Sequence, residues 1–209
     1  MGVVSRILQS FNRNRYGILT GHEINRQVEI GRIKISPYSV TNINPNSYNI
    51  SLSDKFLIYN FPKVIDLKDP STYSDYHEVK IPEEGIILRP GLVYLISTME
   101  RISTNYYEPI ITGRSSIGRL GISVHQEAGF GDIGYDGTFT FHLKVTYPTK
   151  IYPHITIGQV YFLTPCGEIT KLYNGKYNKS NSAVASKWGI DGFAGAAIKS
   201  MEKERGNFE

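Results

Sequence analysis

The sequence has little cysteine and no long apolar run. Cys166 is the single cysteine, so no internal disulfide can form and a reducing compartment is expected. No apolar stretch reaches the ~18 residues that a transmembrane helix needs, and the first residues lack the features of a secretory signal. We therefore expect a cytoplasmic protein without a membrane span.

A strong charge bias is also missing. The 23 lysines and arginines stand against 19 acidic residues, a net charge of +4, and the two signs are interspersed along the chain. Nucleic-acid-binding proteins usually gather basic residues into a patch or stripe, so no nucleic-acid partner is expected. Glycine and proline are plentiful, at 20 and 10 residues, which favours short strands joined by turns over long helices.

Apolar and polar residues alternate through the middle of the chain, over residues 32–163. Residues 48–59, YNISLSDKFLIY, are typical, with Ile50 and Leu52 on one face. This period of two predicts many short strands. The pattern indicates a mainly β protein, either a sandwich or a jelly-roll barrel.

Helical spacing is clearest at the beginning of the chain. Residues 3–11 place apolar side chains on one face of an amphipathic helix, which packs on its own domain or, alternatively, contacts a partner. A capping-box pattern that opens at Thr20 predicts a second helix over 21–30. The end of the chain is polar. We divide the chain into an N-terminal extension (1–18), a β domain (19–170) and a C-terminal arm (171–209).

Three familiar motifs are incomplete in this sequence. Residues 129–134 match G-x-G-x-x-G, but a strand pattern follows them instead of a helix, which excludes a dinucleotide fingerprint. Residues 113–119 lack the Lys-Ser/Thr pair of a P-loop. His125 and Glu127 resemble part of a zinc-deaminase signature, but that site needs a second cysteine. No side-chain metal site is therefore predicted.

The segment 113–119, GRSSIGR, still suits phosphate binding. Arg114 and Arg119 supply positive charge, and Ser115 and Ser116 supply hydroxyls. The flanking glycines leave backbone N–H groups accessible to an anion. The alternative is a turn followed by a short capped helix with solvated arginines.

Five segments together resemble the superfamily of dCTP deaminases and trimeric dUTPases, over roughly residues 20–188. They are the first strand (43–56), a serine motif (113–119), an aspartate–tyrosine hairpin (128–137), a glutamine motif (158–159) and the C-terminal arm (175–187). The resemblance implies a distorted jelly-roll β-barrel that assembles as a homotrimer. It also implies active sites between subunits and an arm that closes over them.

The resemblance further implies which residues hold a deoxypyrimidine triphosphate, dUTP or dCTP. Ser115, Arg119 and Gln159 would contact the phosphates. Tyr135 would pack against the deoxyribose, unless it is an ordinary core aromatic residue, and the hairpin backbone from Ala128 onward would read the pyrimidine edge. The full implied set of binding residues is Arg114, Ser115, Ser116, Arg119, Ala128, Tyr135, Gln159, Lys176, Tyr177, Ser180 and Phe193.

Three positions depart from the family pattern. His142 stands where family deaminases carry the glutamate that moves protons during attack at C4 of cytosine. Ser180 and Asn49 stand where the family has a base-facing glutamine and a first-strand aspartate. A histidine can also shuttle protons near neutral pH, or His142 is an ordinary buried side chain. The arm keeps Lys176 and Tyr177, which would cover the phosphates.

The features that the resemblance implies for a dUTPase are better kept. Asp132 matches the acid that orients water toward the α-phosphate, and Phe193 weakly matches the phenylalanine that stacks on uracil. Mg²⁺ would be held largely by the triphosphate and by water. The catalytic candidates are Asp132 and, for deamination, His142. We expect hydrolysis of dUTP to dUMP and pyrophosphate.

Two alternatives stay open at the level of the sequence. The first is deamination of dCTP to dUTP with His142 in place of glutamate, or action on a modified pyrimidine nucleotide. The second is a trimeric nucleotide-binding or structural protein that has lost catalysis. The changes at Asn49, His142 and Ser180, taken together, are the reason that this second alternative stays open.

Overall fold

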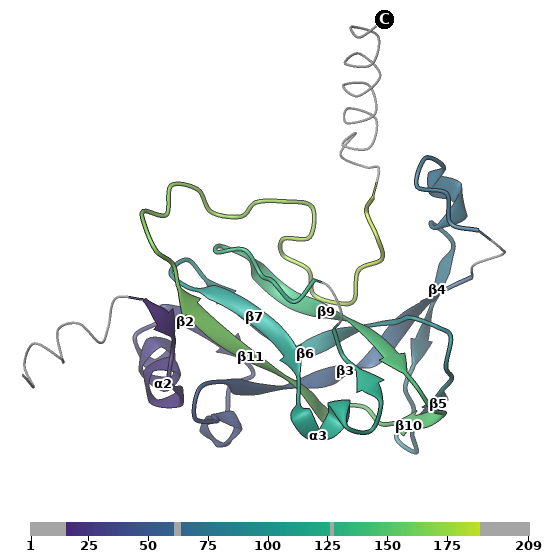
Figure 1. Ribbon diagram of the computed structural model, residues 1–209, viewed down its shortest axis with the longest axis horizontal. Helices are drawn as coiled ribbons and strands as arrows, with labels where there is room; N and C mark the ends of the chain where they lie inside the picture. The colour runs from purple at the N-terminus through teal and green to yellow at the C-terminus, as the bar shows by residue number, and fades with distance from the viewer. Residues whose placement is uncertain (1–15, 61–63, 126–127, 189–209) are drawn as a thin grey trace, which may run out of the picture.

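A curled β-sheet makes up most of the molecule (Figure 1). The computed structural model describes residues 16–60, 64–125 and 128–188. In the main nine-stranded sheet, β1, β11, β3, β6, β9 and β8 lie side by side in that order, while β2 pairs with β6, β4 with β3 and β7 with β11. These strands are β1 (Gly17–Ile18), β2 (Ile33–Ser36), β3 (Tyr48–Tyr59), β4 (Tyr76–Lys80), β6 (Tyr94–Thr104), β7 (Glu108–Gly113), β8 (Ile122–Ser123), β9 (Asp136–Val145) and β11 (Thr156–Thr164). A separate two-stranded sheet is formed by β5 (Ile86–Leu88) and β10 (Thr149–Ile151).

The alternating apolar residues of these strands form one continuous core. Tyr48, Ile50 and Leu52 of β3 are completely buried, and so are Phe141 of β9 and Phe162 of β11. Burial of such apolar surface is the main favourable term in folding. The mainly β, distorted jelly-roll fold that the sequence predicts is therefore confirmed.

Helices are short and lie at the margins of the sheet. α2 (Gly21–Glu29) begins after Thr20, whose Oγ1 accepts a hydrogen bond from the backbone N–H of Glu23 at 3.3 Å. This confirms the capped helix expected there. A single helical turn, α3 (Ser115–Gly118), joins β7 to β8. The helix expected at 3–11 lies outside the described residues, and no helix within the described part of the chain is long and apolar enough to cross a membrane. The 3-10 turns are η1 (Val40–Asn42) and η2 (Pro70–Thr72).

A bulge interrupts β6 in the middle of the sheet. The register of β6 shifts against both β3 and β9, which marks extra residues in one strand. Glu100 lies in this bulge and is only 1% exposed, and its Oε2 accepts a hydrogen bond from the backbone N–H of Ser51 at 2.9 Å. Thr98 Oγ1 likewise accepts one from the N–H of Phe139 at 3.0 Å. Side chains thus supply acceptors where the backbone ladder is broken.

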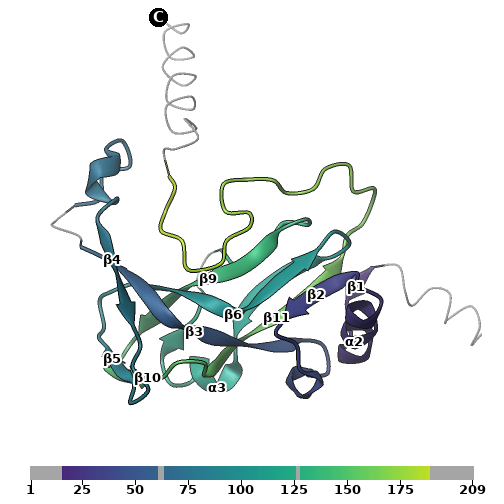
Figure 2. The ribbon, with the colours of Figure 1, turned by 180° about the vertical axis from the view of Figure 1, so that it is seen from behind.

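The chain after β11 runs back over the sheet without forming a helix or strand in residues 165–188 (Figures 1 and 2). The backbone N–H of Thr138 in β9 donates to the carbonyl of Ser180 at 2.8 Å. Ala185 is buried against Leu57 and Leu95 in a small apolar cluster of its own. The arm is therefore held on the sheet, while its boundary with the β domain remains a prediction.

Candidate active site

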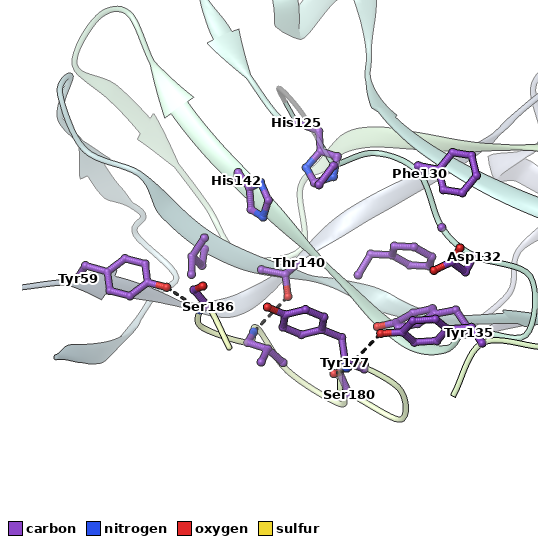
Figure 3. A pocket seen from close by; sticks show the side chains of 16 residues that line it. Tyr59, His125, Phe130, Asp132, Tyr135, Thr140, His142, Tyr177, Ser180 and Ser186 are labelled. Carbon is purple, nitrogen blue, oxygen red and sulfur yellow. Dashed lines mark hydrogen bonds between the residues drawn. The ribbon is translucent and has the colours of Figure 1, made fainter. Parts of the chain in front are cut away.

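A pocket of about 420 Å³ lies between β9, the hairpin that precedes it and the C-terminal arm (Figure 3). Six of the residues selected from the sequence line this pocket: Ala128, Asp132, Tyr135, His142, Tyr177 and Ser180. They come from segments that are far apart along the chain. The arm therefore covers a site that is built on the sheet.

Glycines hold the hairpin tightly against β7. A β-carbon on Gly129 would lie 2.4 Å from the carbonyl oxygen of Ile111, and one on Gly131 would lie 2.8 Å from that of Pro109. The backbone N–H of Ile111 donates to Gly129 at 2.7 Å, and that of Gly131 donates to Pro109 at 2.9 Å. The glycines of the incomplete dinucleotide motif thus serve a close backbone approach. β9, a strand, follows them.

Tyr135 forms one wall of the pocket. Its hydroxyl donates to the carbonyl oxygen of Thr138 at 2.6 Å, and its ring centroid lies 4.6 Å from that of Phe139. Burial is the main reason that the pKa of Tyr135 is raised to about 12, so the phenol stays neutral at physiological pH. A neutral ring backed by a second ring suits the apolar face of a sugar.

Two histidines meet at another side of the pocket. The ring centroids of His125 and His142 are 4.8 Å apart, and the ring planes are tilted by 42°. The pairing of β8 with β9 places Ser123 opposite Lys144, and His125, two residues beyond the end of β8, lies beside His142 of β9. Burial lowers the pKa of His125 below its usual range, so this ring is neutral at pH 7. His125 was considered from the sequence only in the rejected zinc-deaminase pattern, and no pattern in the sequence placed it beside His142.

The predicted phosphate cradle lies elsewhere on the chain. Arg114, Ser115, Ser116 and Arg119 belong to α3 and its flanks, and they are not among the described residues that line the pocket. Both ribbon views place α3 at the lower edge of the molecule, whereas the arm crosses its upper side (Figures 1 and 2). One chain therefore presents the pocket and the cradle at separate places.

Gln159 belongs with the cradle. Its Nε2 donates to the carbonyl oxygen of Gly113 at 3.3 Å, and its Oε1 accepts from the hydroxyl of Ser47 at 3.0 Å. Asn49 is the register partner of Gln159 and accepts a hydrogen bond from Asn44 Nδ2 at 2.9 Å. The serine motif, the glutamine motif and the first strand thus meet in one polar network beside α3.

The arm brings Tyr177 and Ser180 to the pocket but directs Lys176 elsewhere. Lys176 Nζ donates to the carbonyl oxygen of Lys187 at 3.1 Å, and Lys187 Nζ donates to that of Lys176 at 2.6 Å. Each ammonium group lies 5.6 Å from the ring centroid of Tyr177. These contacts give the arm a compact turn at the mouth of the pocket. The predicted site residue Phe193 lies outside the described residues.

The far end of the arm is tied to the connection between β3 and β4. Trp188 Nε1 donates to the carbonyl oxygen of Leu67 at 3.1 Å, and the hydroxyl of Tyr73 donates to that of Trp188 at 3.2 Å. The hydroxyl of Tyr59 accepts from the backbone N–H of Ser186 at 2.6 Å. Figure 3 places this anchor, at Tyr59 and Ser186, on the side of the pocket away from the hairpin.

A distorted jelly roll with a nucleoside-sized pocket beneath a C-terminal arm defines a class of nucleotide-processing β proteins. Comparison with known proteins shows which family within this class the chain belongs to. The family model described as dCTP deaminase-like matches residues 18–164, and the chain belongs to this family. The resemblance found in the sequence motifs is thereby confirmed.

Individual relatives support the same assignment. The chain is 45% identical over 170 residues to the "dCTP deaminase, dUMP-forming" of Leptospira biflexa, which covers 81% of this chain and 94% of the relative. The protein of the same name from Clostridium beijerinckii is 42% identical over 169 residues, which covers 81% and 95%. A solved 2'-deoxycytidine 5'-triphosphate deaminase from Agrobacterium tumefaciens matches with a TM-score of 0.58 and 22% identity, over 73% of this chain and 49% of that one. This last likeness concerns the fold alone.

Proposed function

We propose that the protein hydrolyses dUTP to dUMP and pyrophosphate. The observation that carries this proposal is the distribution of acids in the pocket, where Asp132 is the only carboxylate among the described lining residues. Asp132 lies toward Tyr135 and away from the pair formed by His125 and His142 (Figure 3). A carboxylate near the sugar side suits chemistry at a phosphate, whereas the other side offers imidazoles.

Asp132 would act on the attacking water. Its side chain is at the exposed rim of the pocket, where water has access. The carboxylate would orient a water molecule and take up its proton as the water oxygen bonds to the α-phosphorus. The bond from that phosphorus to the bridging oxygen then breaks, and pyrophosphate leaves. A positioned acid or base of this kind is typically worth ~10²–10⁴ in rate.

Magnesium fits this arrangement. Within the described residues, no group of three or more His, Cys, Asp or Glu side chains forms a closed metal site. Mg²⁺ usually keeps several waters and binds substrate phosphates with one or two carboxylates. Asp132 would face the Mg²⁺ ion together with Glu108. The pKa of Glu108 is raised by burial and by the nearby charge of Asp132. When bound, the ion would neutralise negative charge on the triphosphate.

The nucleotide would extend across two subunits of a homotrimer. Tyr135 and the arm residues Tyr177 and Ser180 would enclose the nucleoside in one chain. The triphosphate would reach Ser115 and Arg119 of a neighbouring chain. The separation of α3 from the pocket within one chain (Figures 1 and 2) supports this arrangement, because a single copy would leave a triphosphate without its arginines.

Deamination of dCTP is the second candidate. The relatives named above are dUMP-forming dCTP deaminases, and His142 lines the pocket at the position where the family resemblance implies a glutamate. An imidazole beside a second imidazole can carry protons near neutral pH. This candidate differs from the first in one measurable product, ammonia.

Product analysis separates these possibilities. The purified protein is incubated with dUTP or dCTP, with and without Mg²⁺, and the nucleotides, pyrophosphate and ammonia are quantified. We expect dUMP and pyrophosphate from dUTP, only with Mg²⁺, and unchanged dCTP. Ammonia released from dCTP as fast as dUTP is hydrolysed would establish the second candidate. No turnover of either nucleotide, with binding retained, would establish a nucleotide-binding protein without catalysis.

The substitution Asp132→Asn tests the residue that carries the proposal. The amide keeps the shape of the side chain but cannot accept a proton from water, so kcat should fall by at least ~10² while dUTP binding remains. Asp75→Asn is the matched control, because Asp75 is an exposed acid that pairs with Asn60 at 3.2 Å in the connection between β3 and β4. Normal turnover by Asp132→Asn would remove Asp132 from the mechanism.

A further inference from the structure

Arg101 on β6 connects two elements that close the pocket. Its Nε donates to Asp136 Oδ1 at 2.9 Å, and its Nη2 lies 2.9 Å from Asp136 Oδ2. Its third nitrogen, Nη1, donates to Asn181 Oδ1 at 2.5 Å. The guanidinium group therefore joins β6, the first residue of β9 and the arm, using a two-pronged contact and a single one.

The same part of the arm is bound to β9 through the backbone. The N–H of Asp136 donates to Asn178 Oδ1 at 3.0 Å, and the N–H of Lys179 donates to the carbonyl oxygen of Asp136 at 2.7 Å. The N–H of Thr138 donates to the carbonyl oxygen of Ser180 at 2.8 Å. This short run of the arm therefore lies along the beginning of β9, and Arg101 binds at its edge.

We infer that Arg101 is a positioning residue that holds the arm closed over the nucleotide, an inference that rests on the proposed dUTP hydrolysis. Arg101 is not among the described residues that line the pocket, so it acts through its two partners. Asp136 directly follows Tyr135, and Asn181 directly follows Ser180, and both of these neighbours line the pocket. The guanidinium group thus fixes the sugar wall and the covering arm relative to each other.

Loss of the Arg101 contacts should weaken substrate binding and should not change the rate of the chemical step. When only a fraction of molecules has the arm closed, the apparent affinity for nucleotide falls by that fraction. The side chains of Arg101 and Asp136 are 36% and 41% exposed, so solvent screens their pairing and the effect is moderate. Arginine suits this place better than lysine, because its planar group serves the carboxylate and the amide at once.

The test uses the full chain with Arg101→Met and Asn181→Ala, separately and combined. Each single variant should raise KM for dUTP about five-fold and keep kcat within about two-fold of the unchanged protein. In the absence of nucleotide, hydrogen exchange of the arm amides should be faster in each variant than in the unchanged protein. The double variant should resemble Arg101→Met alone, because both changes remove the same connection between Arg101 and Asn181. Arg101→Lys should have a KM between those of Arg101→Met and the unchanged protein.

Lys55→Met is the matched control. It also removes one positive charge, and it breaks the exposed pair between Lys55 and Glu78 at 3.0 Å, where β3 meets β4. It should change neither KM nor arm exchange.

Three results would overturn the inference: an unchanged KM and arm exchange in Arg101→Met, a lowered kcat with unchanged KM, or multiplied effects in the double variant. If Arg101→Met does not fold, Asn181→Ala decides, because Asn181 is exposed on the arm. If the unchanged protein does not consume dUTP, the proposed function fails, and arm exchange still decides the role of Arg101.

Discussion

At the scale of the residue, the chemistry open to this pocket depends on position 142. A carboxylate there could take a proton from water and return it to the leaving ammonia. His142 instead lies against His125, with ring centroids 4.8 Å apart. Because burial lowers the pKa of His125, this neighbour is neutral and places no positive charge beside His142. Asp132 is then the one carboxylate among the described residues that line the pocket, on the side where we propose that phosphate chemistry takes place.

The variant His142→Glu should gain deamination. We expect ammonia release from dCTP about 10²-fold above the unchanged protein, because a positioned acid/base returns to the base end of the pocket. His142→Gln is the control, since it has the same length as glutamate but transfers no proton. Ammonia release is measured at matched Mg²⁺. Rapid release by the unchanged protein that is lost in His142→Glu would show instead that the imidazole itself carries the proton.

Part of the site could be predicted from the sequence, because motif segments keep their order along the chain. Asp132, Tyr135 and His142 belong to one such segment, and all three line the pocket. His125 was not predicted, because its contact with His142 depends on strand register. The link from Arg101 to Asn181 joins residues 80 positions apart, a pairing that no local pattern encodes.

At the scale of the element, the bulge in β6 makes stability depend on pH. Burial raises the pKa of the Glu100 carboxyl above its ordinary value of 4.5, so the folded chain binds this proton more tightly than the unfolded chain. The contribution of Glu100 to stability is therefore fully present below pH 4.5 and is lost as pH rises through the raised folded pKa. Glu100→Gln should flatten this part of the profile, as measured by denaturant unfolding at several pH values.

Glu100→Ala separates the charge from the hydrogen bond. It removes the acceptor for the N–H of Ser51, and an unpaired buried N–H should lower the free energy of unfolding by about 1–3 kcal/mol at every pH. Equal losses in the alanine and glutamine variants would contradict a role for this hydrogen bond.

Removal of the arm should spare the fold. Among the described residues, the main core contains none beyond β11, and the arm adds buried Ala185 and partly buried Ala183 to the small cluster with Leu57 and Leu95. A chain that ends at Thr170 should therefore remain folded and trimeric but bind triphosphates weakly. Circular dichroism, sedimentation and nucleotide titration measure these three properties. An unfolded truncated chain would show that the arm is needed for stability.

The strands differ in how far the sequence reveals them. β3 is long and alternates, so its residues 48–59 were predicted from their period of two and are confirmed. β1 and β8 have two residues each, too few for any period to be read. The bulge in β6 also left no pattern, because its hydrogen bonds come from side chains that reach across to other strands.

At the scale of the whole molecule, the proposed nucleotide site, divided between the pocket and the cradle, would need more than one copy of the chain to be complete. We expect a homotrimer in sedimentation experiments at micromolar concentration. Subunits carrying Asp132→Asn and subunits carrying Arg119→Ala should each be inactive alone. Co-assembled in equal amounts, they should recover about one quarter of full activity, because random mixing joins two intact halves at that share of interfaces.

A doubly substituted chain controls for this complementation. Subunits with both Asp132→Asn and Arg119→Ala offer no intact half, so mixing them with Asp132→Asn subunits should restore nothing. A monomer in sedimentation, or full activity in either single variant, would contradict a site shared between subunits.

The anchor at the far end of the arm also has a spectroscopic consequence. Trp188 is the only tryptophan of the chain, and its indole N–H is hydrogen-bonded to the carbonyl oxygen of Leu67. Lifting the arm would transfer this N–H to water and shift the emission of the indole to longer wavelength. If the arm opens during turnover as we propose, the protein carries its own fluorophore on the moving segment, and stopped-flow mixing with nucleotide would record the rate of opening without any attached dye.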